Sequence, residues 1–121
     1  MSKTGLRTTE TKRKYAKFIA EGHLDEGCNL CKKPKSVKEF KYWRIVKNKF
    51  PWDRISKIGH LLIPKRHTIF RKLNRLEKKE LEMIRSKYVE NNYDIIVETT
   101  DKKKTIPAHF HFHLIVVKDK I

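Results

Sequence analysis

Three histidines stand at alternate positions near the end of the chain, in the segment HFHFHLI at residues 109–115. In an extended strand alternate side chains share a face, so His109, His111 and His113 are predicted to point one way and the intervening apolar side chains the other. Three imidazoles on one face can bind a single metal ion. They can also act on phosphorus, where a neutral imidazole attacks while its neighbours orient it and stabilise charge on the phosphoryl oxygens. The spacing alone fits either chemistry.

The chain has two cysteines, Cys28 and Cys31, in a CxxC pair. In a reducing compartment such a pair is more typical of a metal or redox site than of a structural disulfide. A closed tetrahedral zinc site needs four ligands, so histidines would have to complete it. A thioredoxin-like role is disfavoured because the pair does not follow a strand in a βαβ setting, and two unliganded thiols are the remaining alternative.

Positive charge dominates the composition, with 30 Lys and Arg against 14 Asp and Glu and a formal net charge of +16. Such an excess attracts anions and favours phosphate-rich partners. Residues 32–49 hold eight basic residues and one acidic one, with Phe40, Tyr42 and Trp43 among them, a combination that could bind a nucleic-acid backbone and stack on bases. The charge is spread over the whole chain, so a solvated lysine-rich surface explains it equally well.

A chain of 121 residues is long enough for one domain with its own core. We expect residues 1–8 to be disordered and residues 9–121 to form a single domain. Residues 1–14 lack the apolar segment of a signal peptide, and no later apolar run is long enough to cross a bilayer. The expectation is therefore a cytoplasmic protein, with the nucleus as the alternative, and no membrane partner.

Apolar spacing and end signals predict an α+β domain. Residues 8–22 are predicted to form a short N-terminal helix that stops at Gly22, and a main helix is predicted to begin near Asn74, with Glu77 at its N3 position. The apolar stripe predicted for the main helix consists of Leu76, Leu81, Ile84 and Tyr88. The segments predicted as strands are residues 39–48, 59–64, 93–99 and 109–117. Their order indicates an antiparallel sheet with the main helix packed on one face.

The segment HFHFHLI resembles the pattern His-φ-His-φ-His-φ-φ, with φ apolar, of the histidine triad (HIT) superfamily of nucleotide hydrolases and transferases. The resemblance continues in CNLC, YWRIVKNKFPWD, GHLLIPKRH and the helix LEKKELEMI, which follow one another in the family's order over roughly residues 26–117. It implies a HIT-like fold and an enzyme that acts on a phosphoric anhydride or phosphoramidate bond. It also implies a homodimer, formed through the main helix and a strand.

The resemblance implies a role for each histidine of the triad. His111 would be the nucleophile that attacks the α-phosphorus of a nucleotide and forms a covalent nucleotidyl-histidine. His113 would contact the phosphate oxygens, and His109 would position His111. Water or a second acceptor would then release the nucleoside monophosphate.

The resemblance also implies candidates for substrate binding. Asn48 matches the residue that hydrogen-bonds the ribose, although a turn-forming role explains it almost as well, and Ile45 and Phe50 are candidates for the walls of the base pocket. Many members have a Ser or Gln shortly before the triad that assists the leaving group. This chain departs from them there, and Thr105 and Lys104 are the nearby polar substitutes.

Members that carry the cysteine pair resemble this chain at two further positions, which implies a structural Zn²⁺ held by Cys28, Cys31, His67 and His109. Of the other histidines, His60 is expected to be structural or at the pocket edge. His23 is expected to be exposed. Two rival interpretations remain: a zinc-stabilised nucleic-acid-binding module without enzymatic activity, and a hydrolase in which all three triad histidines bind a catalytic metal ion.

Overall fold

The computed structural model describes residues 5–22, 30–31, 35–98 and 109–119. In chain order the elements are helix α1 (Thr9–Ala20), strands β1 (Ser36–Glu39), β2 (Trp43–Lys47) and β3 (Ser56–Pro64), a 3-10 turn η2 (Phe70–Lys72), helix α2 (Arg75–Met83), a π-helical segment η3 (Ile84–Val89), helix α3 (Glu90–Asn92), and strands β4 (Ile95–Val97) and β5 (Phe112–Val117). Among these described helices, none is long and apolar enough to cross a membrane.

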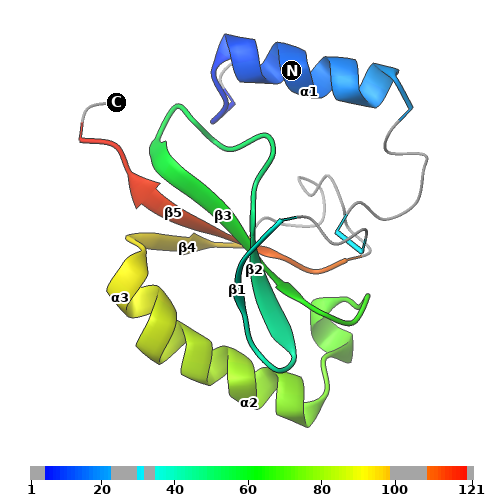
Figure 1. The fold of residues 1–121 in the computed structure, drawn as a ribbon, viewed down its shortest axis with the longest axis vertical. Helices are drawn as coiled ribbons and strands as arrows, with labels where there is room; N and C mark the ends of the chain where they lie inside the picture. The colour runs from blue at the N-terminus through cyan, green and yellow to red at the C-terminus, as the bar shows by residue number, and fades with distance from the viewer. Residues whose placement is uncertain (1–4, 23–29, 32–34, 99–108, 120–121) are drawn as a thin grey trace.

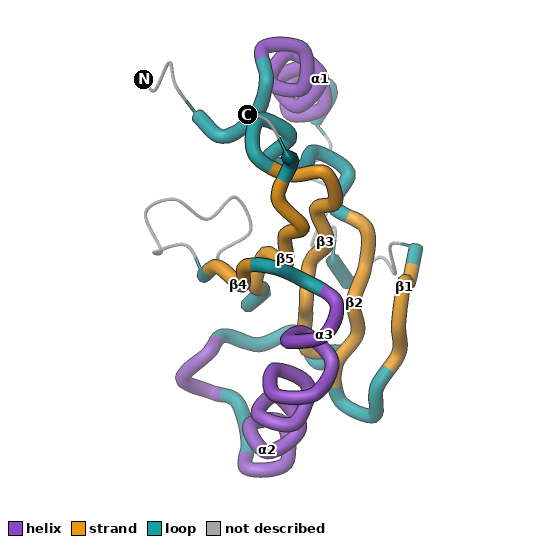
Figure 2. The backbone as a smooth tube through the Cα atoms, turned by 90° about the vertical axis from the view of Figure 1, so that its left-hand side faces the viewer, coloured by secondary structure: helices purple, strands orange, loops and turns teal. Residues whose placement is uncertain are grey.

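The strands form one five-stranded sheet in the order β1-β2-β3-β5-β4, and every neighbouring pair is antiparallel. β3 and β5 lie next to each other at the middle of the sheet, where Leu61 pairs with His113 and Leu62 with Phe112. Helix α2 lies at one end of the molecule and α1 at the other (Figures 1 and 2). The α+β prediction of an antiparallel sheet with one main helix and a short N-terminal helix is therefore confirmed.

The two faces of the sheet carry different side chains because neighbouring residues of a strand point in opposite directions. One face packs against α2 and η3 and forms the main core, to which Trp43, Ile45, Leu62, Phe110, Phe112, Leu114, Leu81 and Ile84 all belong. The indole Nε1 of Trp43 also donates to the carbonyl of Glu77, at 2.8 Å, which ties β2 to the helix. On the other face Leu30, Val46, Leu61 and Ile63 form a smaller buried cluster. We call the first the helix face and the second the histidine face.

Helix α2 begins as its sequence predicts. The side chain of Asn74 accepts from Glu77 N and the side chain of Glu77 accepts from Asn74 N, both at 2.8 Å, which is a complete capping box. Leu81 and Ile84 are buried as predicted, but Leu76 is 53% exposed. Leu76 therefore does not belong to the core-facing stripe, because the first turn of α2 carries it on the outer side of the helix.

All four predicted strands have limits that differ from those expected. Strand β3 begins at Ser56, before the expected residue 59, and β4 spans only Ile95–Val97 of the expected residues 93–99. Residues 39–48 are split by a turn, because Phe40 N bonds to Trp43 O (2.8 Å) and the carboxylate of Glu80 accepts from the backbone of the turn. Strand β5 begins at Phe112 instead of residue 109, since β3 ends at Pro64, which lacks the N–H that a longer ladder needs.

The N-terminal helix ends as predicted, with Gly22 in the left-handed region at φ 80°. Of the segment expected to be disordered, residues 1–4 lie outside the described part of the chain. Residues 5–8 are described, and they contact the loop between β2 and β3.

Candidate functional site

His109 and His111 lie on the segment that leads into β5, and His113 lies within β5. All three are buried, with exposed fractions of 1% for His109, 4% for His111 and 7% for His113. Phe110 and Phe112, between them, belong to the core of the helix face. The predicted alternation therefore holds even where the segment precedes the regular strand. The rings of His111 and His113 lie edge to face with centroids 5.4 Å apart.

His111 is oriented by the backbone of its neighbour. Its Nδ1 lies 3.1 Å from the carbonyl oxygen of His109. A carbonyl can only accept a hydrogen bond, so Nδ1 carries the hydrogen in the neutral ring and Nε2 carries the lone pair. The main chain thus fixes the tautomer in which Nε2 carries the lone pair.

His113 is held in an apolar environment. The indole of Trp52 stacks on its ring with centroids 3.9 Å apart and an interplanar angle of 19°. Burial, together with the nearby His111 and the positive charge of Arg7, lowers the pKa of His113 to about 3. His113 is therefore neutral near pH 7, where it can exchange hydrogen bonds with a ligand but brings no charge.

Trp52 reaches His113 because the loop between β2 and β3 folds back onto the histidine face. A Cβ placed on Gly59 would lie only 2.9 Å from the Cβ of Pro51, so the glycine permits this close approach. Pro51 directly precedes Trp52 in the chain. Sequence reasoning treated this loop as a turn and missed the contact of Trp52, because no local pattern shows onto which face the loop folds.

The side chain of His109 turns in another direction. Its Nε2 lies 2.9 Å from the carbonyl oxygen of Pro64, so Nε2 carries the hydrogen, and its Nδ1 lies 3.3 Å from Sγ of Cys31. Burial lowers the pKa of His109 despite the bond to Pro64, and the charges of His67, His111 and Arg44 lower it further. The ring is thus neutral, with its lone pair directed at the sulfur.

Cys31, His67 and His109 lie close enough to hold a metal ion, because their ligand atoms are all within 4.8 Å of one another. Nδ1 of His67 is 3.1 Å from Sγ of Cys31. Around tetrahedral zinc a Cys sulfur and a His nitrogen are about 3.5 Å apart, given the usual bond lengths, so these distances fit such an ion. The bond from His109 to Pro64 is the kind of outer contact that fixes a ligating imidazole. Three of the four predicted ligands come together, and Cys28 lies outside the described residues.

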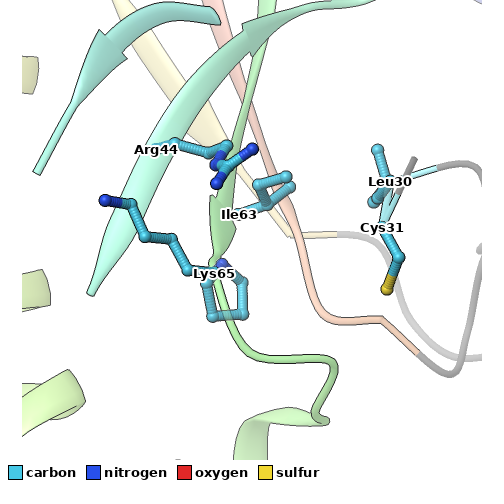
Figure 3. A pocket seen from close by; sticks show the side chains of 6 residues that line it. Leu30, Cys31, Arg44, Ile63 and Lys65 are labelled. Carbon is cyan, nitrogen blue, oxygen red and sulfur yellow. The ribbon is translucent and has the colours of Figure 1, made fainter. Parts of the chain in front are cut away.

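A small pocket of about 90 Å³ lies beside Cys31 and is lined by Leu30, Cys31, Arg44, Ile63, Pro64 and Lys65. Figure 3 shows the guanidinium of Arg44 reaching toward Ile63, while the ammonium of Lys65 points away from Cys31. Glu39 is near both cations, 3.7 Å from Arg44 and 3.1 Å from Lys65. The pocket therefore adjoins Cys31 of the Cys–His group, and its two cations are partly offset by Glu39.

The predicted substrate-binding residues lie in different places. Asn48 Oδ1 accepts from Phe50 N at 3.1 Å, which is the bond of a turn-forming Asn, and Phe50 packs against Tyr15 and Phe18 of α1. Ile45 is fully buried in the core of the helix face, so the structure does not bring it to the histidines; its neighbour Val46 faces that side instead. Thr105 and Lys104 lie outside the described residues.

His60 lies away from the triad. It pairs with Leu114 across the sheet, which places it on the helix face, and its Nδ1 is 2.6 Å from the hydroxyl of Tyr93. Burial lowers the pKa of His60, aided by the charge of Lys47, and burial raises the pKa of Tyr93 to about 12. This agrees with the structural role expected for His60. His23 lies outside the described residues.

Comparison with known proteins gives a likeness in fold. No protein-family model matches the sequence, and no curated protein matches it. A solved structure of a histidine triad protein from Clostridium difficile superposes with a TM-score of 0.55 at 18% sequence identity, covering 79% of this chain and 94% of that chain. The chain therefore has a HIT-like fold.

Proposed function

We propose that this protein is a HIT-type nucleotide hydrolase or nucleotidyl transferase in which Nε2 of His111 attacks the α-phosphorus of a nucleotide. The observation that carries the proposal is the bond between His111 Nδ1 and the carbonyl oxygen of His109, which leaves the lone pair on Nε2. An imidazole in this tautomer is a neutral nucleophile and needs no separate base to remove a proton first.

The reaction has two steps. In the first, the Nε2–phosphorus bond forms, and the bond from phosphorus to the leaving group breaks; the leaving group departs with its electron pair and is protonated from solvent. In the second, water or the hydroxyl of an acceptor attacks phosphorus and loses its proton to solvent, the phosphorus–nitrogen bond breaks, and His111 regains its lone pair. His113, neutral and next to His111, would hydrogen-bond the phosphoryl oxygens.

His109 has two separate tasks in this scheme. Its main-chain carbonyl orients His111, while its ring faces Cys31. We propose that Cys28, Cys31, His67 and His109 hold a structural Zn²⁺. Zinc supplies only a cross-link here, joining the segment at Cys31 to the end of β3 and to the start of the triad.

The rival hydrolase with a catalytic metal would need all three histidines around one ion. His109 instead faces Cys31 and His67, whereas His111 lies against His113, whose ring stacks on Trp52. This division favours covalent catalysis by His111 over metal-bound water. The rival nucleic-acid-binding module is supported by the net charge of +16, and the experiment below separates it from the enzyme.

The test is to trap the intermediate. The full-length protein is incubated with a panel of labelled nucleotides, including dinucleoside polyphosphates and nucleoside phosphoramidates, quenched without acid, and weighed intact by mass spectrometry. We expect one nucleotidyl group per chain, mapped to His111, that is labile in acid and stable in base. His111→Asn should carry none, and His60→Asn, which changes a histidine on the helix face, should carry as much as wild type.

Two results would contradict the proposal. Wild-type protein that turns over a nucleotide with no adduct at any time has a different mechanism. The protein is instead the nucleic-acid-binding module if wild type turns over no nucleotide and if wild type and His111→Asn bind single-stranded RNA with equal affinity.

A further inference from the structure

The segment before α1 is joined to the loop that carries Trp52. Nε of Arg7 donates to the carbonyl oxygen of Phe50 at 2.7 Å, and the N–H of Arg54 donates to the carbonyl oxygen of Leu6 at 2.9 Å. Phe50 and Arg54 lie on either side of Trp52 in this loop. The N-terminal segment thus packs along the same loop whose indole covers His113.

Asp53 fixes this arrangement. Its carboxylate accepts from Thr8 N at 2.8 Å, from the Thr8 hydroxyl at 3.1 Å, and from the Thr11 hydroxyl. Burial acts to raise the pKa of Asp53, but the hydrogen bonds from Thr11 and Thr8 outweigh it and lower the pKa. An ionised Asp53 therefore holds the first turn of α1 against the loop.

Arg7 is held in place on two sides. Besides the bond to Phe50, its guanidinium lies over the ring of Tyr15, 4.7 Å from the centroid. Its positive charge is also felt at His113, where it is one of the causes of the low pKa. An arginine side chain stays protonated under ordinary conditions even where burial lowers its pKa, as it does for Arg7. Arg7 is thus a permanent cation fixed against the loop whose indole stacks on His113.

A nucleotide phosphate at His111 would need a positive charge that the triad does not supply. His113 is neutral, and the ring of His109 faces Cys31. Arginine suits this task because its planar guanidinium can give two parallel hydrogen bonds to a phosphate. The bond to Phe50 uses Nε, so the Nη groups are the donors that would meet the ligand.

We propose that Arg7 binds the phosphate of the nucleotide at the histidine triad, so that the N-terminal segment forms part of the substrate site. This inference rests on the proposed function. Arg7 would supply the site with a cation. The sequence alone did not predict this role, because residues 1–8 carry no recognisable motif.

The experiment compares nucleotides with their phosphate-free nucleosides. Full-length wild type, Arg7→Gln, Arg7→Lys and Arg13→Gln are titrated calorimetrically with AMP, adenosine, GMP and guanosine. Arg13→Gln is the matched control, since Arg13 is an exposed arginine on α1. We expect Arg7→Gln to weaken monophosphate binding about 10- to 100-fold, as loss of a charged hydrogen bond does, with nucleoside affinity within about twofold of wild type. Arg7→Lys should recover part of the loss, and Arg13→Gln should match wild type.

A purely structural role for Arg7 would weaken AMP and adenosine alike, and that result would overturn the inference. The inference would also be overturned if Arg7→Gln kept the wild-type ratio of AMP affinity to adenosine affinity. If Arg7→Gln fails to fold, Arg7→Lys is compared in the same way. If wild type itself binds AMP no better than adenosine, the role of Arg7 is wrong. The trapping experiment at His111 uses no Arg7 variant and decides the proposed function independently.

Discussion

The two faces of the sheet are made from the same strands, yet they are covered in different ways. The helix face is sealed by α2 and η3, whose buried side chains Leu81 and Ile84 meet Trp43 and Leu114 in one apolar core. The histidine face is covered by pieces from distant parts of the sequence, including Leu30 and the loop bearing Trp52. These pieces are attached largely by hydrogen bonds and ring contacts. We therefore propose that the helix face supplies stability and that the histidine face carries the chemistry proposed for His111.

The largest expected effect comes from changing one buried residue on each face. His111→Asn should lower turnover by about 10⁴-fold or more, because it removes the nucleophile, and should leave the free energy of unfolding within about 1 kcal/mol of wild type. Leu114→Ala should do the opposite, costing about 2–5 kcal/mol of stability with turnover per folded molecule unchanged. Denaturant unfolding and a nucleotide hydrolysis assay measure both.

The separate roles proposed for the two faces would be disproved if the core variant lost turnover as the histidine variant does. If Leu114→Ala, assayed where it is fully folded, lost as much turnover as His111→Asn, the core of the helix face would be part of the chemistry. Leu62→Ala, a second fully buried leucine on the helix face, serves as the matched control for cavity formation.

The helix face could be predicted from sequence because its signals are local. Two such signals are the alternating apolar residues of β5 and the Asn74–Glu77 capping box. Each involves residues that lie close together in the chain. The alternation of the three histidines is equally local. The exposure of Leu76 is not, because it depends on which side of α2 meets the sheet.

The histidine face was only partly predictable, because its geometry depends on how loops dock. Nothing in the sequence indicates that Trp52 stacks on His113 or that Arg7 approaches it. The tautomers of His109 and His111 are likewise set by two carbonyl groups whose positions follow from the ends of the strands. The grouping of Cys31, His67 and His109 was anticipated from family resemblance, and spacing alone had left other ligand sets open.

The second prediction concerns the metal site, which we propose as the strongest attachment on the histidine face. Purified protein should contain one Zn²⁺ per chain by elemental analysis. His67→Asn should lower that content and cost about 3 kcal/mol or more, which lowers Tm by about 10 °C or more. His60→Asn is the control for metal content, because it removes a histidine that lies on the helix face. Full stability in His67→Asn without bound metal would show that zinc plays no structural part.

The third prediction uses the low pKa of His113. An unfolded histidine takes up a proton as pH falls through about 6.5, whereas folded His113 stays neutral until about pH 3. Between these values the unfolded state binds more protons, so stability is lost as pH falls. The contribution of His113 approaches about 1.4 kcal/mol per pH unit below pH 6, which gives about 2 kcal/mol between pH 6.5 and 4.5.

Replacing His113 with Gln should remove this contribution. Free energies of unfolding at pH 6.5 and 4.5, measured in a chelator so that metal loss does not interfere, should fall less in His113→Gln than in wild type. Equal losses in both proteins would mean that His113 is accessible to protons, and that Trp52 does not shield it.

The smallest effect on stability is expected on the outer side of α2, where we propose that two copies of the chain meet. Leu76 and Met83 are 53% and 44% exposed, and they line a shallow groove of about 460 Å³ with Tyr42, Lys79, Glu80 and Lys87. An exposed apolar pair of this kind on the principal helix is typical of an association surface.

Leu76→Glu should change the free energy of unfolding of the monomer by less than about 0.5 kcal/mol, since its side chain contributes little to the core. It should nevertheless convert a wild-type dimer into a monomer in sedimentation velocity, because a carboxylate would be buried without a partner at the interface. Ile58→Glu, which changes an exposed apolar residue at the start of β3, should leave the dimer intact. A wild-type protein that sediments as a monomer at all concentrations would show that this groove is not a dimer interface.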